Sequence, residues 1–99
     1  MQGNYTKSKR ADRDIQAIVI HGLTDFGEVQ VDAYLNGLKN KMKLLANSPD
    51  IGREYVHSRT QRRYLRFRHE SHVIYYRKRT NDIIITRILH VRMLPENHL

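Results

Sequence analysis

Cysteine is absent from the chain, and no apolar run approaches the length of a membrane span. Without cysteine there is no disulfide framework, no thiolate metal site and no cysteine nucleophile, which fits a reducing cytoplasm. Because a spanning helix needs about 20 mostly apolar residues, no membrane association is expected. The N-terminal stretch MQGNYTKSKR leads into no apolar core of the kind that a signal peptide requires. We therefore expect a soluble cytoplasmic protein.

Apolar residues are also scarce, at 39% of the 99 residues, against about 45–50% in typical globular domains. A chain of this length forms one domain, residues 1–99, and buries about 60–70% of the surface that its unfolded form exposes. The apolar residues are patterned rather than scattered, so the chain is expected to fold around a thin core. Thin cores often depend on a partner.

Acidic residues are few in one stretch, which carries nearly all of the net charge of +8. Residues 1–52 contain seven basic residues (Lys or Arg) and six acidic residues (Asp or Glu). Residues 53–79 contain nine basic and two acidic residues, and residues 80–99 contain two of each kind. Eight of the nine cations in the middle stretch are arginines. The planar guanidinium matches phosphate or carboxylate, so nucleic acid or an acidic protein is the expected partner.

Helical spacing of apolar residues dominates the first half of the chain. The first helix is predicted to end near Gly27, and its apolar positions are Ile15, Ile18, Val19, Leu23 and Phe26. A second helix is predicted to begin around Glu28, with apolar positions Val31, Tyr34, Leu35, Leu38, Met42 and Leu45. The connection is short, so the two helices should form an antiparallel hairpin.

The turn NSPDIG ends the second helix, and after it the apolar residues recur at every second position, as in β-strands. Three strands follow, around residues 64–68, 73–76 and 83–91, and NYTKSK near the N-terminus predicts a short edge strand. The expected fold is α+β in the order β-α-α-β-β-β. The helix hairpin packs on one face of a mainly antiparallel sheet, and the first strand lies beside the last.

The last predicted strand is apolar on both faces, which is typical of a strand in the interior of a sheet. Strict alternation places one set of side chains on one face of the strand, namely Ile83, Ile85, Leu89 and Val91. It places Ile88, His90 and Arg92 on the other face. If the helices cover Leu89, then His90 and Arg92 lie on the open face. Arg62, Tyr64, Arg66 and Arg68 alternate in the same way, and the strand register decides which of them join His90 and Arg92. We favour an open face lined with arginines, tyrosines and a histidine.

Such a face supports either protein docking or phosphate chemistry, and spacing in the sequence does not decide between them. His69 and His72 are joined by no thiol or carboxylate cluster, and no cofactor or metal is expected. His21 and His57 are predicted to lie on the surface. The five glycines form no phosphate-binding loop. Because the basic charge lies on the strands rather than the helices, sequence-specific DNA binding by the chain alone is not expected.

Three segments, NSPDIGRE, SHVIYYR and RILHVRMLPENHL, resemble the ParE branch of the RelE/ParE toxins of bacterial type II toxin-antitoxin modules. The resemblance covers nearly the whole chain. It implies the β-α-α-β-β-β fold, a ParD-like antitoxin that wraps the toxin, and inhibition of DNA gyrase by binding rather than by catalysis. RelE-like relatives instead cleave messenger RNA on the ribosome with the help of a lysine-rich cluster, and residues 53–68 contain no lysine.

These considerations select the candidate site residues. Docking to a target or antitoxin is assigned to Arg62, Arg66, Arg87, His90, Arg92, Met93 and Pro95. The alternative, a RelE-like ribosome-dependent endoribonuclease, would use Arg92, His90 and His98, since Arg92 and His98 fall near that branch's catalytic positions. A third class, a non-toxic nucleic-acid-binding module or degenerate toxin, also stays open.

Overall fold

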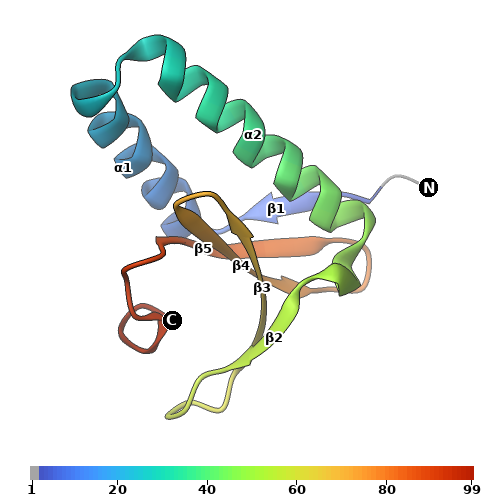
Figure 1. Cartoon of the computed structure of the whole chain (residues 1–99). Helices are drawn as coiled ribbons and strands as arrows, with labels where there is room; N and C mark the ends of the chain where they lie inside the picture. Colours follow the sequence, from blue (N-terminus) through green and yellow to red (C-terminus); the bar gives the residue numbers. More distant parts are fainter. Residues whose placement is uncertain (1–2) are drawn as a thin grey trace.

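The computed structural model describes residues 3–99, and Met1 and Gln2 of the polar N-terminal stretch lie outside the described residues. Two helices cover one side of a five-stranded sheet, and the C-terminal segment lies on the other side (Figure 1). The elements are β1 (Tyr5–Lys7), α1 (Lys9–Asp25), α2 (Glu28–Asn47), β2 (Arg53–Val56), β3 (Arg63–His69), β4 (His72–Lys78) and β5 (Ile83–His90). Two short 3-10 helices, Pro49–Ile51 and Pro95–Asn97, complete the chain.

The helix hairpin is confirmed at its predicted positions. Ser8 caps α1, because its hydroxyl accepts a hydrogen bond from the Ala11 amide at 3.0 Å. Gly27 connects the helices at φ 88°, a left-handed conformation that favours glycine. The tip of the hairpin extends beyond the sheet (Figure 1), and Phe26 there is 68% exposed. Among residues 3–99, neither helix is both long and apolar enough to cross a membrane.

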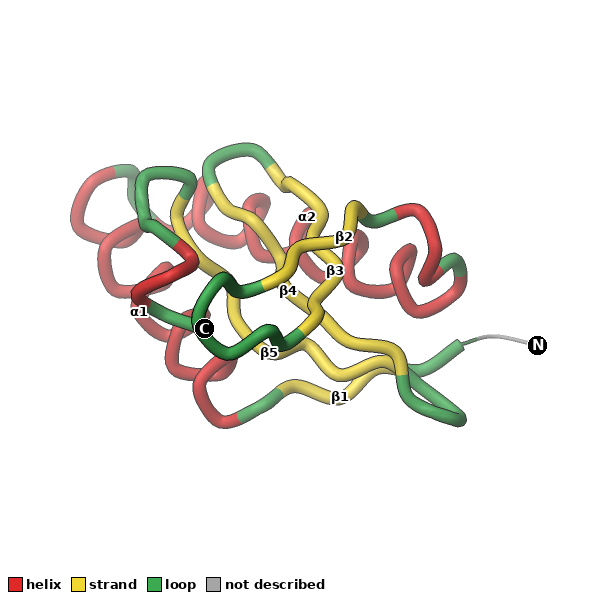
Figure 2. Tube along the Cα trace, turned by 90° about the horizontal axis from the view of Figure 1, so that it is seen from below, coloured by secondary structure: helices red, strands yellow, loops and turns green. Residues whose placement is uncertain are grey.

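The predicted fold class is confirmed, and the strands form one sheet in the order β1-β5-β4-β3-β2. As expected, β1 pairs with β5, and this pair is parallel, whereas the other three pairs are antiparallel. The structure adds β2, which the sequence analysis missed because Arg53 and Glu54 interrupt its apolar pattern. Seen from below in Figure 2, the strands lie in front of the two helices.

A β-bulge in β5 corrects the predicted faces of this strand. Tyr75 pairs with Arg87 and Tyr76 pairs with Ile85, so Thr86 is an extra residue without a partner. The alternation therefore shifts by one residue after Ile85, as a bulge requires. Ile88 joins Ile83 and Ile85 in the core against the helices, and Leu89 packs on the opposite face, which we call the outer face. The prediction that the helices cover Leu89 was wrong.

Asp14 on α1 covers the edge of β5 where the short strand β1 has ended. Its carboxylate accepts hydrogen bonds from the Arg87 guanidinium at 2.8 and 2.9 Å and from the Ile88 amide at 2.9 Å. The side chains of Asp14 and Arg87 are 14% and 12% exposed. This ion pair therefore fixes α1 against the sheet and satisfies a backbone donor that β1 does not reach.

Replacing Asp14 by alanine leaves the Arg87 guanidinium largely buried without its carboxylate. We expect Asp14→Ala to lower the free energy of unfolding by about 3 kcal/mol, measured by urea denaturation. The matched control is Glu54→Ala, which breaks the exposed Arg63–Glu54 pair at 3.4 Å and should cost about 0.5 kcal/mol or less. Equal effects of the two substitutions would contradict a structural role for the Asp14–Arg87 pair.

Candidate functional site

Arginines and tyrosines share the outer face of the sheet. The Arg66 guanidinium lies 5.0 Å from the centre of the Tyr55 ring, and that of Arg77 lies 5.9 Å from the Tyr64 ring. Beneath the arginines is a buried cluster of Tyr64, Tyr75 and Leu89. The aromatic rings therefore support the guanidinium groups by cation–π contact and hold them in place at the surface.

The C-terminal tail, residues 91–99, folds onto the outer face through Glu96. The Glu96 carboxylate accepts hydrogen bonds from the hydroxyls of Ser58 and Tyr55 and from the Ser58 amide at 3.0 Å. These bonds lower the pKa of Glu96 to about 2, whereas burial and the nearby Glu96 charge raise the pKa of Tyr55 to about 12. Leu99 packs against the outer cluster, so the tail covers part of this face.

His57 supports the same attachment from inside the β2–β3 connection. Its Nδ1 accepts from the amides of Arg59 and Thr60, both at 3.2 Å, so its Nε2 carries the proton and donates to the Glu96 carbonyl at 3.0 Å. The side chain is fully buried. The prediction that His57 lies on the surface was therefore wrong, because hydrogen bonds to backbone groups of its own loop and of the tail replace its contact with water.

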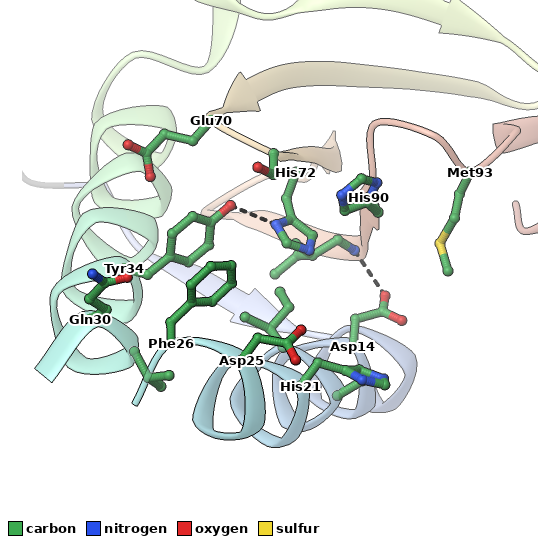
Figure 3. A pocket seen from close by; sticks show the side chains of 16 residues that line it. Asp14, His21, Asp25, Phe26, Gln30, Tyr34, Glu70, His72, His90 and Met93 are labelled. Carbon is green, nitrogen blue, oxygen red and sulfur yellow. Dashed lines mark hydrogen bonds between the residues drawn. The ribbon is translucent and has the colours of Figure 1, made fainter. Parts of the chain in front are cut away.

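On the opposite side, a cleft of about 690 Å³ opens between α1, α2 and the ends of β4 and β5. Figure 3 shows Tyr34 entering it from one helix and Asp14 and His21 from the other, with His72 and His90 on the sheet side. The apolar lining consists of Ala17, Ile18, Phe26, Val31, Ile88 and Met93. The cleft therefore combines an apolar wall with a few convergent polar groups, as binding sites usually do.

Tyr34 organises the histidines at the base of the cleft. Its hydroxyl lies 2.6 Å from His72 Nδ1 and donates to the His69 carbonyl at 3.2 Å. Since one hydroxyl has one proton, both contacts are satisfied when His72 carries its proton on Nδ1 and donates it to Tyr34. The His90 ring lies 5.3 Å from the His72 ring, and the buried Nε2 of His69 has no hydrogen-bond partner within residues 3–99.

Burial lowers the pKa of His72 to about 4, with smaller contributions from His90 and His69 and an opposing one from Asp14. The imidazole is therefore neutral at physiological pH. Within residues 3–99, no three His, Asp or Glu side chains are grouped as metal ligands would be. The cleft consequently combines a mainly apolar wall with a neutral imidazole, and the carboxylates of Asp25 and Glu70 are also among its lining residues.

The predicted site residues do not form one surface. Arg66 lies on the outer face, and Arg62 is exposed just before β3 begins. His90, however, lines the cleft with Met93, because the bulge turns it toward the helices. The prediction that His90 lies on the open face was therefore wrong. Arg87 is held by Asp14 and by the His98 carbonyl at 2.8 Å.

The remaining predicted residues follow β5. The Arg92 side chain is exposed, and its amide donates to His90 Nδ1 at 3.1 Å. Pro95 begins the 3-10 helix of the tail, and its carbonyl accepts from the amides of His98 and Leu99. The tail that carries His98 is bonded to the β2–β3 connection through Glu96, whereas His90 lines the cleft.

Comparison with known proteins decides the family. The family described as "ParE toxin of type II toxin-antitoxin system, parDE" matches residues 5–95. The chain belongs to the ParE toxin family. A solved structure described as "Chromosomal ParDE TA system from P. aeruginosa" superposes with a TM-score of 0.74 at 18% identity, over 92% of this chain and 98% of that one. No curated protein sequence matches. The resemblance to ParE toxins is thus confirmed.

Sequence reasoning missed several residues that shape this ParE-family structure. Tyr34 was assigned to the apolar face of α2, although its hydroxyl organises the histidines. Asp14 and Glu96 carried no signal, because their partners lie 73 and 38 residues away. Asp14 lies in the first predicted helix and Glu96 in the tail, and neither position identifies its partner.

The neutral state of His72 predicts that stability depends on pH. The folded-state pKa of about 4 lies below the unfolded value of about 6.5, so the unfolded chain gains the proton first as pH falls. The free energy of unfolding should therefore fall between pH 7 and pH 5, by about 1 kcal/mol after allowance for the partial exposure of His72. His72→Asn should reduce this slope in urea denaturation, whereas His21→Asn, at an exposed position, should keep it. An unchanged slope in His72→Asn would contradict this assignment.

Proposed function

We propose that this ParE-family chain is the toxin of a type II toxin-antitoxin module, acts in the bacterial cytoplasm, and inhibits DNA gyrase by protein binding. We further propose that a ParD-type antitoxin neutralises it. The family match over residues 5–95 is the observation that carries the proposal. No cofactor is required, because docking onto a protein target needs surface complementarity rather than bond chemistry.

Exposed apolar residues near the cleft support a protein partner. Ile20, Leu23, Phe26 and Val29 on the helix hairpin are 64%, 48%, 68% and 84% exposed. Water-exposed apolar side chains concentrated on one element often mark an interaction site. The adjoining cleft wall is also apolar, so an amphipathic helix of the antitoxin would bury its apolar side there.

The ribonuclease alternative receives less support from the geometry. Acid–base cleavage needs an acid and a base within hydrogen-bond reach of one phosphate. His90 lies in the cleft, and the tail carrying His98 is attached to the other face of the sheet. Arg92, Met93 and Pro95 are therefore proposed as docking residues between these two regions.

A gyrase assay tests the proposed target directly. Purified chain added to DNA gyrase should stop supercoiling of relaxed plasmid and increase cleaved plasmid, and it should leave ribosome-bound messenger RNA intact. Preincubation with the cognate antitoxin should restore supercoiling. Cleavage of ribosome-bound message with normal supercoiling would instead establish the endoribonuclease alternative.

A paired substitution tests the cleft as the antitoxin site. Ala17 is exposed and lines the cleft, whereas Ala33 is exposed on α2 and is not among the lining residues. Ala17→Glu would bury an unpaired charge under the antitoxin and should weaken binding at least about tenfold in calorimetry. Ala33→Glu should leave the affinity within about twofold. Equal affinities of the two variants would place the antitoxin elsewhere.

A further inference from the structure

Four arginines project from the outer face, and we call them the arginine face: Arg53, Arg66, Arg68 and Arg77. They come from β2, β3 and β4, and the strand register places them on one side of the sheet. None of the four forms an ion pair within residues 3–99, whereas Arg63, Arg79 and Arg87 each have a carboxylate partner. The uncompensated positive charge is therefore concentrated on one surface.

Two of these arginines oppose each other directly, since Arg53 pairs with Arg66 across β2 and β3. Like charges at directly opposite positions destabilise a sheet unless an anion lies between them. Glu96 is the carboxylate that reaches this face, and its oxygens accept hydrogen bonds from Tyr55 and Ser58 rather than from an arginine. The arginine face is thus built to hold an anion that the described part of the chain does not supply.

The apolar residues of this face indicate what kind of anion fits. Tyr64, Tyr75 and Leu89 are only 6%, 3% and 1% exposed, and the ring of the partly buried Tyr55 lies against the Arg66 guanidinium. An acidic peptide would normally anchor apolar side chains beside its charges, and these residues offer it no exposed partner. The same burial prevents the tyrosines from stacking on bases, as single-stranded nucleic acid requires. The remaining candidate partner is a polyanion that is recognised through its charge alone.

We propose that the arginine face binds the phosphate backbone of duplex DNA without reading its sequence. Planar guanidinium groups suit phosphate oxygens. Cation–π contacts with Tyr55 and Tyr64 hold the guanidinium groups of Arg66 and Arg77 in position before an anion binds. Contacts to the backbone fix position but carry no sequence information. This surface lies on the opposite side of the sheet from the cleft, so the proposal holds or fails independently of the antitoxin contact proposed there.

Fluorescence anisotropy of the full chain with a short labelled DNA duplex of mixed sequence tests this inference over a range of KCl concentrations. Each phosphate contact contributes about 0.9 to the slope of log affinity against log salt, so R53Q/R66Q/R77Q should reduce the slope by about 2 to 3 and weaken binding at least about tenfold. The lysine variant R53K/R66K/R77K keeps the charge and should keep most of the slope.

The matched control is R10Q/R13Q/K39Q, which removes three exposed cations from the helices and gives the same net charge. It should change the slope by less than about 1, because distant cations contribute only to the screened field. Urea denaturation checks that both glutamine variants fold. If R53Q/R66Q/R77Q does not fold, the single variant R66Q replaces it. Equal slopes for the two triple variants would overturn the proposal. So would tighter binding of poly-glutamate or duplex RNA than of the DNA at the same salt.

Discussion

The extra residue in β5, Thr86, determines which side chains after it face the helices and which lie on the outer face of the sheet. Its hydroxyl donates to the Tyr75 carbonyl at 2.9 Å, and its own carbonyl accepts from the Ser8 hydroxyl at 2.8 Å. Ser8 also caps α1, and its amide donates to Ile85 at 2.9 Å, so the bulge and the start of the first helix are one hydrogen-bonded unit. A shift of one residue sends every later side chain to the other face. This unit therefore decides that Ile88 enters the core and that Arg87 reaches Asp14.

The shift separates two surfaces of different chemistry. His90 joins His72 and Tyr34 in an apolar cleft beneath the helix hairpin, while arginines remain on the outer face. Charged and apolar recognition impose opposite demands on a surface, since a guanidinium loses solvation in an apolar groove and an exposed apolar side chain adds nothing to phosphate binding. Because the two surfaces lie on opposite faces of one sheet, each keeps its own chemistry.

Local periodicity predicted both helices, the turn after them and three of the strands, because each signal lies within about twenty residues of sequence. The N-terminal strand and its place beside the last strand followed from the element order. The bulge was not predictable, since a single inserted residue leaves the pattern of Ile83 to Leu89 equally compatible with strict alternation. For this reason His90 was assigned to the wrong face, and the arginines of the open face could not be chosen before the strand register was known. The bonds of Asp14 and Glu96, and the bond from His57 to the Glu96 carbonyl, connect positions far apart in the chain, so composition and spacing carry no trace of them.

Long-range polar contacts also explain how a thin core supports this fold. Tyr76 is buried, and its hydroxyl donates to the Pro49 carbonyl at 2.6 Å and accepts from the Gly52 amide at 3.1 Å. Tyr34 and Tyr55 also connect distant segments, since Tyr34 donates to the His69 carbonyl and Tyr55 to the Glu96 carboxylate. Leu23 and Phe26 lie outside this core on the hairpin, although their spacing matches its apolar face. Their apolar surface contributes little to the stability of the free chain, and it is available to any partner that covers the cleft. A protein that binds this surface in the folded chain, and does not bind the unfolded chain, would therefore raise the free energy of unfolding.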